Sequence, residues 1–181
     1  MVADTSLLRQ LRSLILPITV VVIIPFLKVG RFHPFGLRFH LPVPFVQVPL
    51  GALAFCGGLL LLVITIRLFV IKGKGTLAPW DPTQKLVTDG VYRYVRNPMI
   101  SGVLSMLIGE AIFFGSWLLF IWALIFGMGN TLYFRLSEEP GLARRFGEDY
   151  LAYRRNVPMW IPRLKPWVRD TESTEANNTG T

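Results

Sequence analysis

The residues best suited to chemistry gather in two polar stretches that flank a long apolar segment. The first stretch covers residues 88–98 and includes Arg96 and Asn97, and the second begins with the adjacent carboxylates Glu138 and Glu139. A guanidinium and an amide donate hydrogen bonds to anions, whereas a carboxylate can bind an ammonium group. If the apolar segment folds back on itself, these groups meet at one face of a membrane. The spacing therefore predicts a polar site at the surface of a small membrane protein.

Each of these residues also has a structural explanation that the sequence alone does not exclude. Asn97 can cap a helix that begins at Pro98, and Arg96 can pair with a lipid phosphate. Glu138 and Glu139 precede a further helix, whose dipole stabilises carboxylates near its N-terminus. Taken alone, each feature is weak evidence for a site.

Composition places the chain in a membrane. Hydrophobic residues make up 52% of the 181 residues and charged residues only 17%, which is too apolar for an ordinary soluble domain. The net charge of +8 comes from basic residues that border apolar spans. This placement favours membrane lipids as a partner and predicts no binding to nucleic acid. His33 and His40 have no carboxylate or Cys at ligand spacing, so we expect no metal site.

The lengths of the apolar stretches predict an all-α integral membrane protein with about four transmembrane helices, since each crossing needs about 20 residues. Residues 98–134 carry one charge, Glu110, and are too many for a single crossing. We therefore expect a helical hairpin that turns at Gly115 and Ser116. Because proline disrupts a helix interior, the second span is expected to begin near Pro49. The predicted spans are 13–30, 49–71, 98–115 and 116–135.

The polar sequence after the last span predicts an amphipathic helix over residues 140–155. Its apolar residues recur at helical spacing, while charged residues fill the other faces. Residues 1–169 are expected to form a single membrane domain, and the polar residues 170–181 a disordered tail. Basic residues are more frequent on the side that holds the termini, so both termini and the site are predicted to be cytoplasmic.

Several ordered motifs in the C-terminal half of the chain make a family resemblance specific. They are Leu86-Val87-Thr88-Asp89-Gly90-Val91-Tyr92, Arg96-Asn97-Pro98-Met99-Ile100-Ser101-Gly102, Glu138-Glu139, Phe146-Gly147-x-x-Tyr150-x-x-Tyr153 and Val157-Pro158. In these motifs the chain resembles the superfamily of membrane enzymes that contains the isoprenylcysteine carboxyl methyltransferases and the phospholipid methyltransferases.

The resemblance implies a pocket for S-adenosylmethionine that faces the cytoplasm and that lipids reach from the side. By matching position, the implied cofactor contacts are Gln84, Lys85, Leu86, Val87, Tyr92, Asn97, Pro98, Met99, Ile100, Glu138 and Glu139. Glu138 suits the cofactor ammonium. The candidates for catalysis are Arg96 and Arg135, and Arg135 is expected to hold the acidic group of the substrate. Gly102 is expected to allow close helix packing.

Two positions depart from the usual motif of the family. This chain has Asn97 where the family usually has His, and Ile100 where it usually has Tyr. Methyl transfer by displacement depends mainly on in-line positioning and on exclusion of water. The departures are therefore compatible with catalysis, although they change the groups that contact the cofactor and the substrate.

The function expected from the resemblance is methyl transfer to a lipophilic small molecule or a lipidated substrate. A carboxylate acceptor is favoured, because a lipid amine or thiol would need a base and the predicted site has no histidine. Two alternatives remain open. One is an NADPH-dependent reductase of the sterol type, which shares a similar C-terminal motif, and the other is a non-enzymatic membrane protein that binds lipid or a partner.

Overall fold

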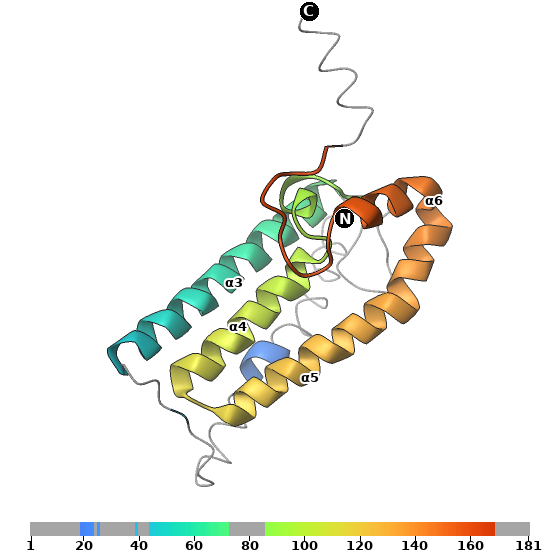
Figure 1. Ribbon diagram of the computed structural model, residues 1–181. Helices are drawn as coiled ribbons and strands as arrows, with labels where there is room; N and C mark the ends of the chain where they lie inside the picture. The colour runs from blue at the N-terminus through green and yellow to red at the C-terminus, as the bar shows by residue number, and fades with distance from the viewer. Residues whose placement is uncertain (1–18, 24, 26–38, 40–43, 73–85, 169–181) are drawn as a thin grey trace, which may run out of the picture.

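The computed structural model describes residues 19–23, 25, 39, 44–72 and 86–168, and helices are the only regular elements in these ranges. In chain order they are η1 (Thr19–Ile23), α3 (Pro44–Lys72), η2 (Gly90–Arg93), α4 (Pro98–Phe114), α5 (Trp117–Tyr133), η3 (Phe134–Glu138) and α6 (Glu139–Asn156). Helices α3, α4 and α5 lie side by side, and α6 bends over one end of them (Figure 1). Most of the predicted span 13–30, the predicted contacts Gln84 and Lys85, and the tail 170–181 lie outside the described residues.

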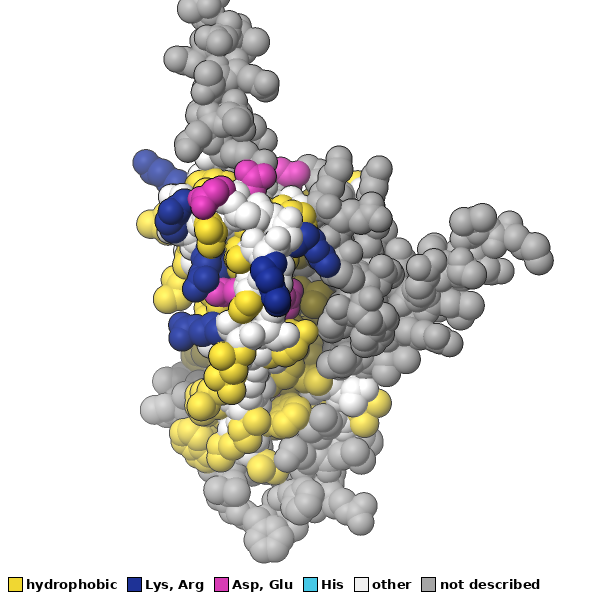
Figure 2. Space-filling model, turned by 90° about the vertical axis from the view of Figure 1, so that its right-hand side faces the viewer, with side chains coloured by type: hydrophobic (Ala, Val, Ile, Leu, Met, Phe, Trp, Pro, Cys, Tyr) yellow, Lys and Arg dark blue, Asp and Glu magenta, His cyan; other side chains and the backbone are white. Residues whose placement is uncertain are grey.

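Two described helices are long and apolar enough to cross a membrane. One covers Phe45–Leu68 of α3, and the other is the continuous helix Trp117–Asn156, whose apolar part is α5. Helix α4 is also apolar but has only 17 residues. Charged side chains gather over α6, whereas apolar side chains cover the α5 end of the same face (Figure 2). This division separates a lipid-compatible body from a polar end.

Helix α3 begins at Pro44, so the predicted start near Pro49 is wrong by about one turn. Pro44 occupies the first position, where the helix needs no backbone N–H donor. Pro49 lies inside the helix and leaves the carbonyl group one turn before it without its usual donor. Apolar helices in membrane proteins tolerate this arrangement because neighbouring groups compensate for the missing bond.

Helices α3 and α4 pack in antiparallel orientation through two reciprocal pairs of glycines, Gly51 with Gly109 and Gly58 with Gly102. A methyl group added at Gly109 would lie 2.8 Å from the carbonyl oxygen of Gly51, and one at Gly102 would lie 2.8 Å from that of Gly58. Ser105 Oγ also donates a hydrogen bond of 2.9 Å to the carbonyl of Ala54 across the interface. Backbones this close require glycine, as at many helix contacts in membranes.

The chain reverses direction between α4 and α5 at Gly115 and Ser116. Gly115 has the left-handed conformation, with φ of 59° and ψ of 44°, which glycine adopts without steric cost. Ser116 caps α5, because its side chain accepts a hydrogen bond from the backbone N–H of Leu119. These two residues complete a helical hairpin.

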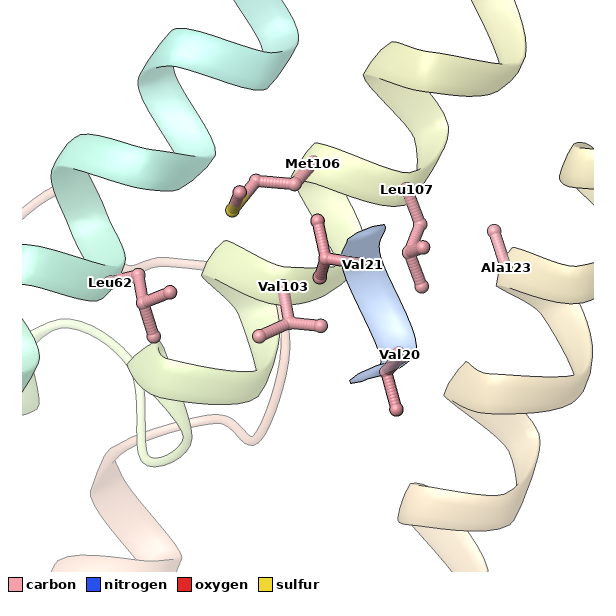
Figure 3. Packing of buried hydrophobic residues seen from close by; sticks show 7 residues of the cluster. All are labelled: Val20, Val21, Leu62, Val103, Met106, Leu107 and Ala123. Atoms are coloured by element: carbon pink, nitrogen blue, oxygen red, sulfur yellow. The ribbon is translucent and has the colours of Figure 1, made fainter. Parts of the chain in front are cut away.

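The apolar core is formed where η1 packs between α4 and α5. Val20 and Val21 of η1 are buried against Val103 and Leu107 of α4 and Ala123 of α5 (Figure 3). The indole N–H of Trp122 donates to the carbonyl of Val20 over 3.4 Å. The segment around residue 20 thus lies inside the helical body.

The last span and the predicted amphipathic helix form one continuous helical path rather than two separate helices. Helix α5 continues through the π-helical turn η3 into α6. Within α6 the backbone bends at Gly147, which has φ of 53° and ψ of −131°. A side chain would be strained in this conformation, so glycine permits the bend. The bend directs the second half of α6 back over the ends of α3 and α4 (Figure 1).

Candidate functional site

The segment after α6 lies against the loop before α4 and fixes its backbone. Arg96 N–H donates to the carbonyl of Pro158 over 2.9 Å, Arg163 N–H to that of Tyr94 over 2.9 Å, and Trp167 N–H to that of Arg93 over 3.0 Å. Two segments far apart in sequence therefore form one wall at the polar end of the molecule.

A cluster of aromatic residues fills the space beneath this wall. Tyr150, Tyr153 and Val157 are buried, and Leu86 and Trp167 pack against them. The hydroxyl of Tyr153 donates to the backbone carbonyl of Tyr92 over 2.8 Å. The second half of α6 is thereby attached directly to η2.

Glu139 is buried between two guanidinium groups. Its side chain is 3% exposed, Arg96 Nη1 lies 2.7 Å from Oε1, and Arg154 Nη2 lies 3.1 Å from Oε2. Arg96 also donates to the hydroxyl of Tyr150 over 3.4 Å. Both oxygens of Glu139 are thus engaged, which argues against Glu139 as the carboxylate that binds a ligand ammonium. Arg96 is thus held by partners within the protein, and its predicted role in catalysis stays a prediction.

Glu138 differs sharply from its neighbour. No ion pair to Glu138 occurs among the described residues, and burial raises the pKa of its carboxyl group. The pKa of Tyr92 is also raised, chiefly by burial and further by the charge of Glu138. Glu138 is therefore a partly buried carboxyl group close enough to Tyr92 to affect its pKa.

Asn97 precedes α4 and is only 4% exposed. Its side chain makes no capping hydrogen bond, so the prediction that Asn97 caps the helix is wrong. The first turn instead uses the Asn97 carbonyl, which accepts bonds from Ser101 N–H (3.0 Å) and Ser101 Oγ (2.9 Å). Its Nδ2 has no hydrogen-bond partner within the described part of the chain. A buried amide donor of this kind is costly unless a ligand or water satisfies it.

The remaining predicted cofactor contacts divide into two groups. Val87 and Ile100 are partly buried near the polar end, and Leu86 belongs to the aromatic cluster. Pro98 is fully buried, and Met99 packs against the apolar core. Pro98 and Met99 therefore have clear structural roles, and any contact they make with a ligand remains a prediction.

An apolar groove of about 450 Å³ runs along α5 and α4. Its walls include Leu104 and Ile108 of α4 and two rows of α5 residues spaced four apart: Ala123, Gly127 and Thr131, and Leu124, Met128 and Leu132. Arg135 and Trp160 also line it. Arg135 follows α5 within η3 and has no ion pair among the described residues. The groove is therefore suited to a hydrocarbon chain whose charged end is anionic.

Three residues that sequence reasoning left without a role in the site emerge from the structure. Tyr150 accepts a hydrogen bond from Arg96, Arg154 binds Glu139, and Trp160 lines the groove beside Arg135. The spacing of Tyr150 and Tyr153 indicated an inward face of the helix. Arg154 and Trp160 carried no such signal, because their partners lie distant in sequence.

Comparisons with known proteins identify the family to which the chain belongs. A family model described as phospholipid methyltransferase matches residues 46–149, which is more than half of the chain. A protein-S-isoprenylcysteine O-methyltransferase of Schizosaccharomyces pombe is 36% identical over 82 residues, covering 44% of this chain and 34% of the relative. Methanethiol S-methyltransferase 2 of Bradyrhizobium diazoefficiens is 34% identical over 84 residues, covering 45% and 30%. The matched part of the chain thus spans about a third of the length of these curated relatives.

Proposed function

This chain belongs to the phospholipid methyltransferase family, and from that premise we propose that it is a membrane enzyme that transfers a methyl group from S-adenosylmethionine to a lipophilic acceptor. The observation that carries the proposal is the apolar groove lined by the guanidinium of Arg135, which has no ion pair among the described residues. Arg135 lies three residues before Glu138 in η3, a partly buried carboxylate with no ion pair in the described part of the chain. A site for a lipid anion and a site for a cation thus lie close together in the chain.

The free polar groups at this end fit the cofactor. The cofactor has an ammonium group, a carboxylate and a sulfonium, so it needs both an acceptor and donors. Glu138 would accept from the ammonium, and the unpartnered Nδ2 of Asn97 would donate to an oxygen of the cofactor. When bound, S-adenosylmethionine supplies an electrophilic methyl group. The Arg96–Glu139–Arg154 cluster holds the walls around it in a fixed position.

The acceptor class that these residues favour is a carboxylate on a hydrocarbon chain. Arg135 would hold and orient the carboxylate anion, and Trp160 would cover it from water. A carboxylate is already deprotonated at neutral pH, so its oxygen can attack the methyl carbon without a general base. The names of the two relatives include an oxygen acceptor and a sulfur acceptor, so a thiol belongs in the test as well.

The proposal includes a membrane setting. Helices α3 and α5 would cross the bilayer in a multi-pass arrangement that also uses α4 and the N-terminal segment. The polar end that holds Glu138 and Arg135 would face the cytoplasm with both termini, following the placement of basic residues. A lipophilic substrate would then reach the groove from the bilayer.

Ligand binding tests this function first. The purified protein in detergent is titrated by calorimetry with S-adenosylhomocysteine and, separately, with NADPH. We expect binding of S-adenosylhomocysteine alone, a loss of at least about tenfold in affinity in Glu138→Gln, and no change in Glu148→Gln. Glu148 is the matched control because its side chain is 85% exposed. Binding of NADPH instead would favour a reductase. Binding of neither ligand would favour a non-enzymatic protein.

Methyl transfer is measured next with cofactor that carries a labelled methyl group. The acceptors are S-farnesylcysteine, palmitate, a long-chain amine and a long-chain thiol. We expect label in the base-labile ester of a carboxylate acceptor, and a lower rate in Arg135→Gln through a raised KM. Label found only in the amine or the thiol would reject the carboxylate assignment while keeping the methyltransferase function.

A further inference from the structure

The groove along α5 is wider at Gly127, because this lining residue has no side chain. The α5 residues that line it follow a helical spacing, and Gly127 lies between Ala123 and Thr131 without a side chain. A methyl group added at Gly127 would lie 3.5 Å and 3.6 Å from the two terminal carbons of Leu104. Alanine would therefore just fit there, whereas a larger side chain would occupy the groove itself.

Gly127 also divides the groove into two parts along its length. Gly127 lies eight residues before Arg135, or about 12 Å along a helix, and Phe120 at the far end lies about 22 Å from Arg135. One leaflet of a bilayer has a hydrocarbon thickness of about 15 Å. A long acyl chain anchored at Arg135 must therefore pass Gly127, whereas a short chain ends before it.

The occupant of the groove follows from its lining and its single charge. The lining beyond Arg135 and Thr131 is apolar, and the only ionised group among the lining residues is Arg135, which has no ion pair among the described residues. The neighbouring residues Met128 and Leu132 are exposed on the outside of the helical body, so a chain can enter from the lipid. These features match a single hydrocarbon chain that ends in a carboxylate.

We propose that Gly127 is the residue that determines which chain lengths this groove accepts, by leaving a passage for the part of a long chain that extends beyond it. This inference rests on the proposed function for the identity of the substrate. It adds a specificity determinant that lies about two helical turns from the charged end.

Photo-crosslinking tests the passage without requiring catalysis. Palmitate and octanoate, each with a diazirine at the end of the chain, are added to the protein in lipid nanodiscs, and the labelled residues are identified by mass spectrometry. In the unaltered protein we expect palmitate to label the region of Phe120 and Ala123, and octanoate to label the region of Met128 and Thr131.

Three variants decide the role of Gly127. In Gly127→Leu, labelling of Phe120 and Ala123 by palmitate should fall at least about tenfold, since several methylenes lose their apolar site, while labelling by octanoate persists. Gly127→Ala should show a smaller loss and guards against a folding defect in the leucine variant. Gly129→Leu is the matched control, because an added side chain at this exposed glycine of the same helix meets no atom within 4 Å.

The outcomes separate the inference from the function on which it rests. Loss of both probes in Gly127→Leu, loss of neither, or the same loss in Gly129→Leu would overturn the role of Gly127. The methyl-transfer assay with palmitate and octanoate is then run on the same variants, and its selectivity should follow the crosslinking. Absence of methyl transfer together with selective crosslinking would reject the proposed reaction and keep Gly127 as the determinant of chain length.

Discussion

The α3–α4 interface and the junction around Glu139 are both buried, but opposite interactions hold them together. The interface depends on missing side chains, because Gly51, Gly58, Gly102 and Gly109 let two backbones approach closely. The junction depends on charge, because Glu139 lies between Arg96 and Arg154. The glycine interface contains no charged group, so it is compatible with a lipid environment. The second is stable only while every charged partner is present.

This difference shows which conditions a buried charged side chain must meet in this molecule. Desolvating a charge is expensive, and a buried ion pair offsets that cost only with good geometry and further hydrogen bonds. In the junction, Glu139 has both oxygens engaged and Arg96 also binds the Tyr150 hydroxyl. The carboxylate of Glu139 is therefore fully engaged, whereas the guanidinium of Arg96 keeps one buried donor, Nε, without a hydrogen-bond partner in the described part of the chain.

The largest effect is expected from breaking the charged junction with Glu139→Ala. Arg96 would remain largely buried without its carboxylate, and loss of one partner of a buried pair typically costs about 3–5 kcal/mol. The measurement is the unfolding free energy in detergent. Glu148→Ala serves as the comparison, because its pair with Arg155 spans 3.5 Å at the surface and should contribute about 0–1 kcal/mol. Equal effects of the two variants would contradict the described junction.

A smaller effect is expected from crowding the glycine interface with Gly109→Ala. The added methyl would lie 2.6 Å from the backbone nitrogen of Phe55, so the helices must separate, at a cost of about 1–3 kcal/mol. Gly57→Ala on α3 is the matched control, because nothing lies within 4 Å of its added methyl. The control should be neutral or slightly stabilising, since alanine favours helix. The two variants are compared by thermal unfolding, and a neutral Gly109→Ala would refute the close packing.

The smallest effect, and one of opposite sign, is expected from Glu138→Gln. Burial raises the pKa of this carboxyl above its ordinary 4.5, so its contribution to stability is complete at low pH and is lost as pH rises through the folded-state pKa. Gln cannot ionise and avoids that loss. The variant without ligand should therefore be more stable than the unaltered protein at neutral pH, by about 1.4 kcal/mol for each pKa unit of the shift.

The pH dependence makes the comparison between the two glutamates sharper. Unfolding is measured at neutral pH and again below pH 4.5, where the advantage of Glu138→Gln should disappear. If Glu138→Gln gains stability and loses S-adenosylhomocysteine binding, the carboxylate of Glu138 serves ligand binding rather than stability. Destabilisation at neutral pH would show instead that Glu138 has a structural partner.

The helical body could be predicted in outline because it depends on local patterns. Apolar length indicated helices, and the Gly115-Ser116 pair supplied both a left-handed residue and a cap. The predicted start of α3 was wrong because helix propensities overestimate the energetic cost of Pro49 within an apolar helix. The bend at Gly147 was not predicted, since helical spacing continues on both sides of it.

The candidate site was less accessible to sequence reasoning because its contacts join distant residues. Glu138 and Glu139 look equivalent in the sequence, and only the positions of Arg96 and Arg154 distinguish the paired carboxylate from the free one. Asn97 has an ideal residue type for a cap, yet its buried side chain makes no capping hydrogen bond.

The hydrogen bonds between residues 93–96 and residues 158–167 have a consequence for biosynthesis. The loop leaves the ribosome first, the hairpin α4–α5 follows it, and the partner segment emerges last. The wall of the site is therefore completed only when Trp167 has left the ribosome. A newly made chain would hold an inserted helical body and an open polar end until that moment.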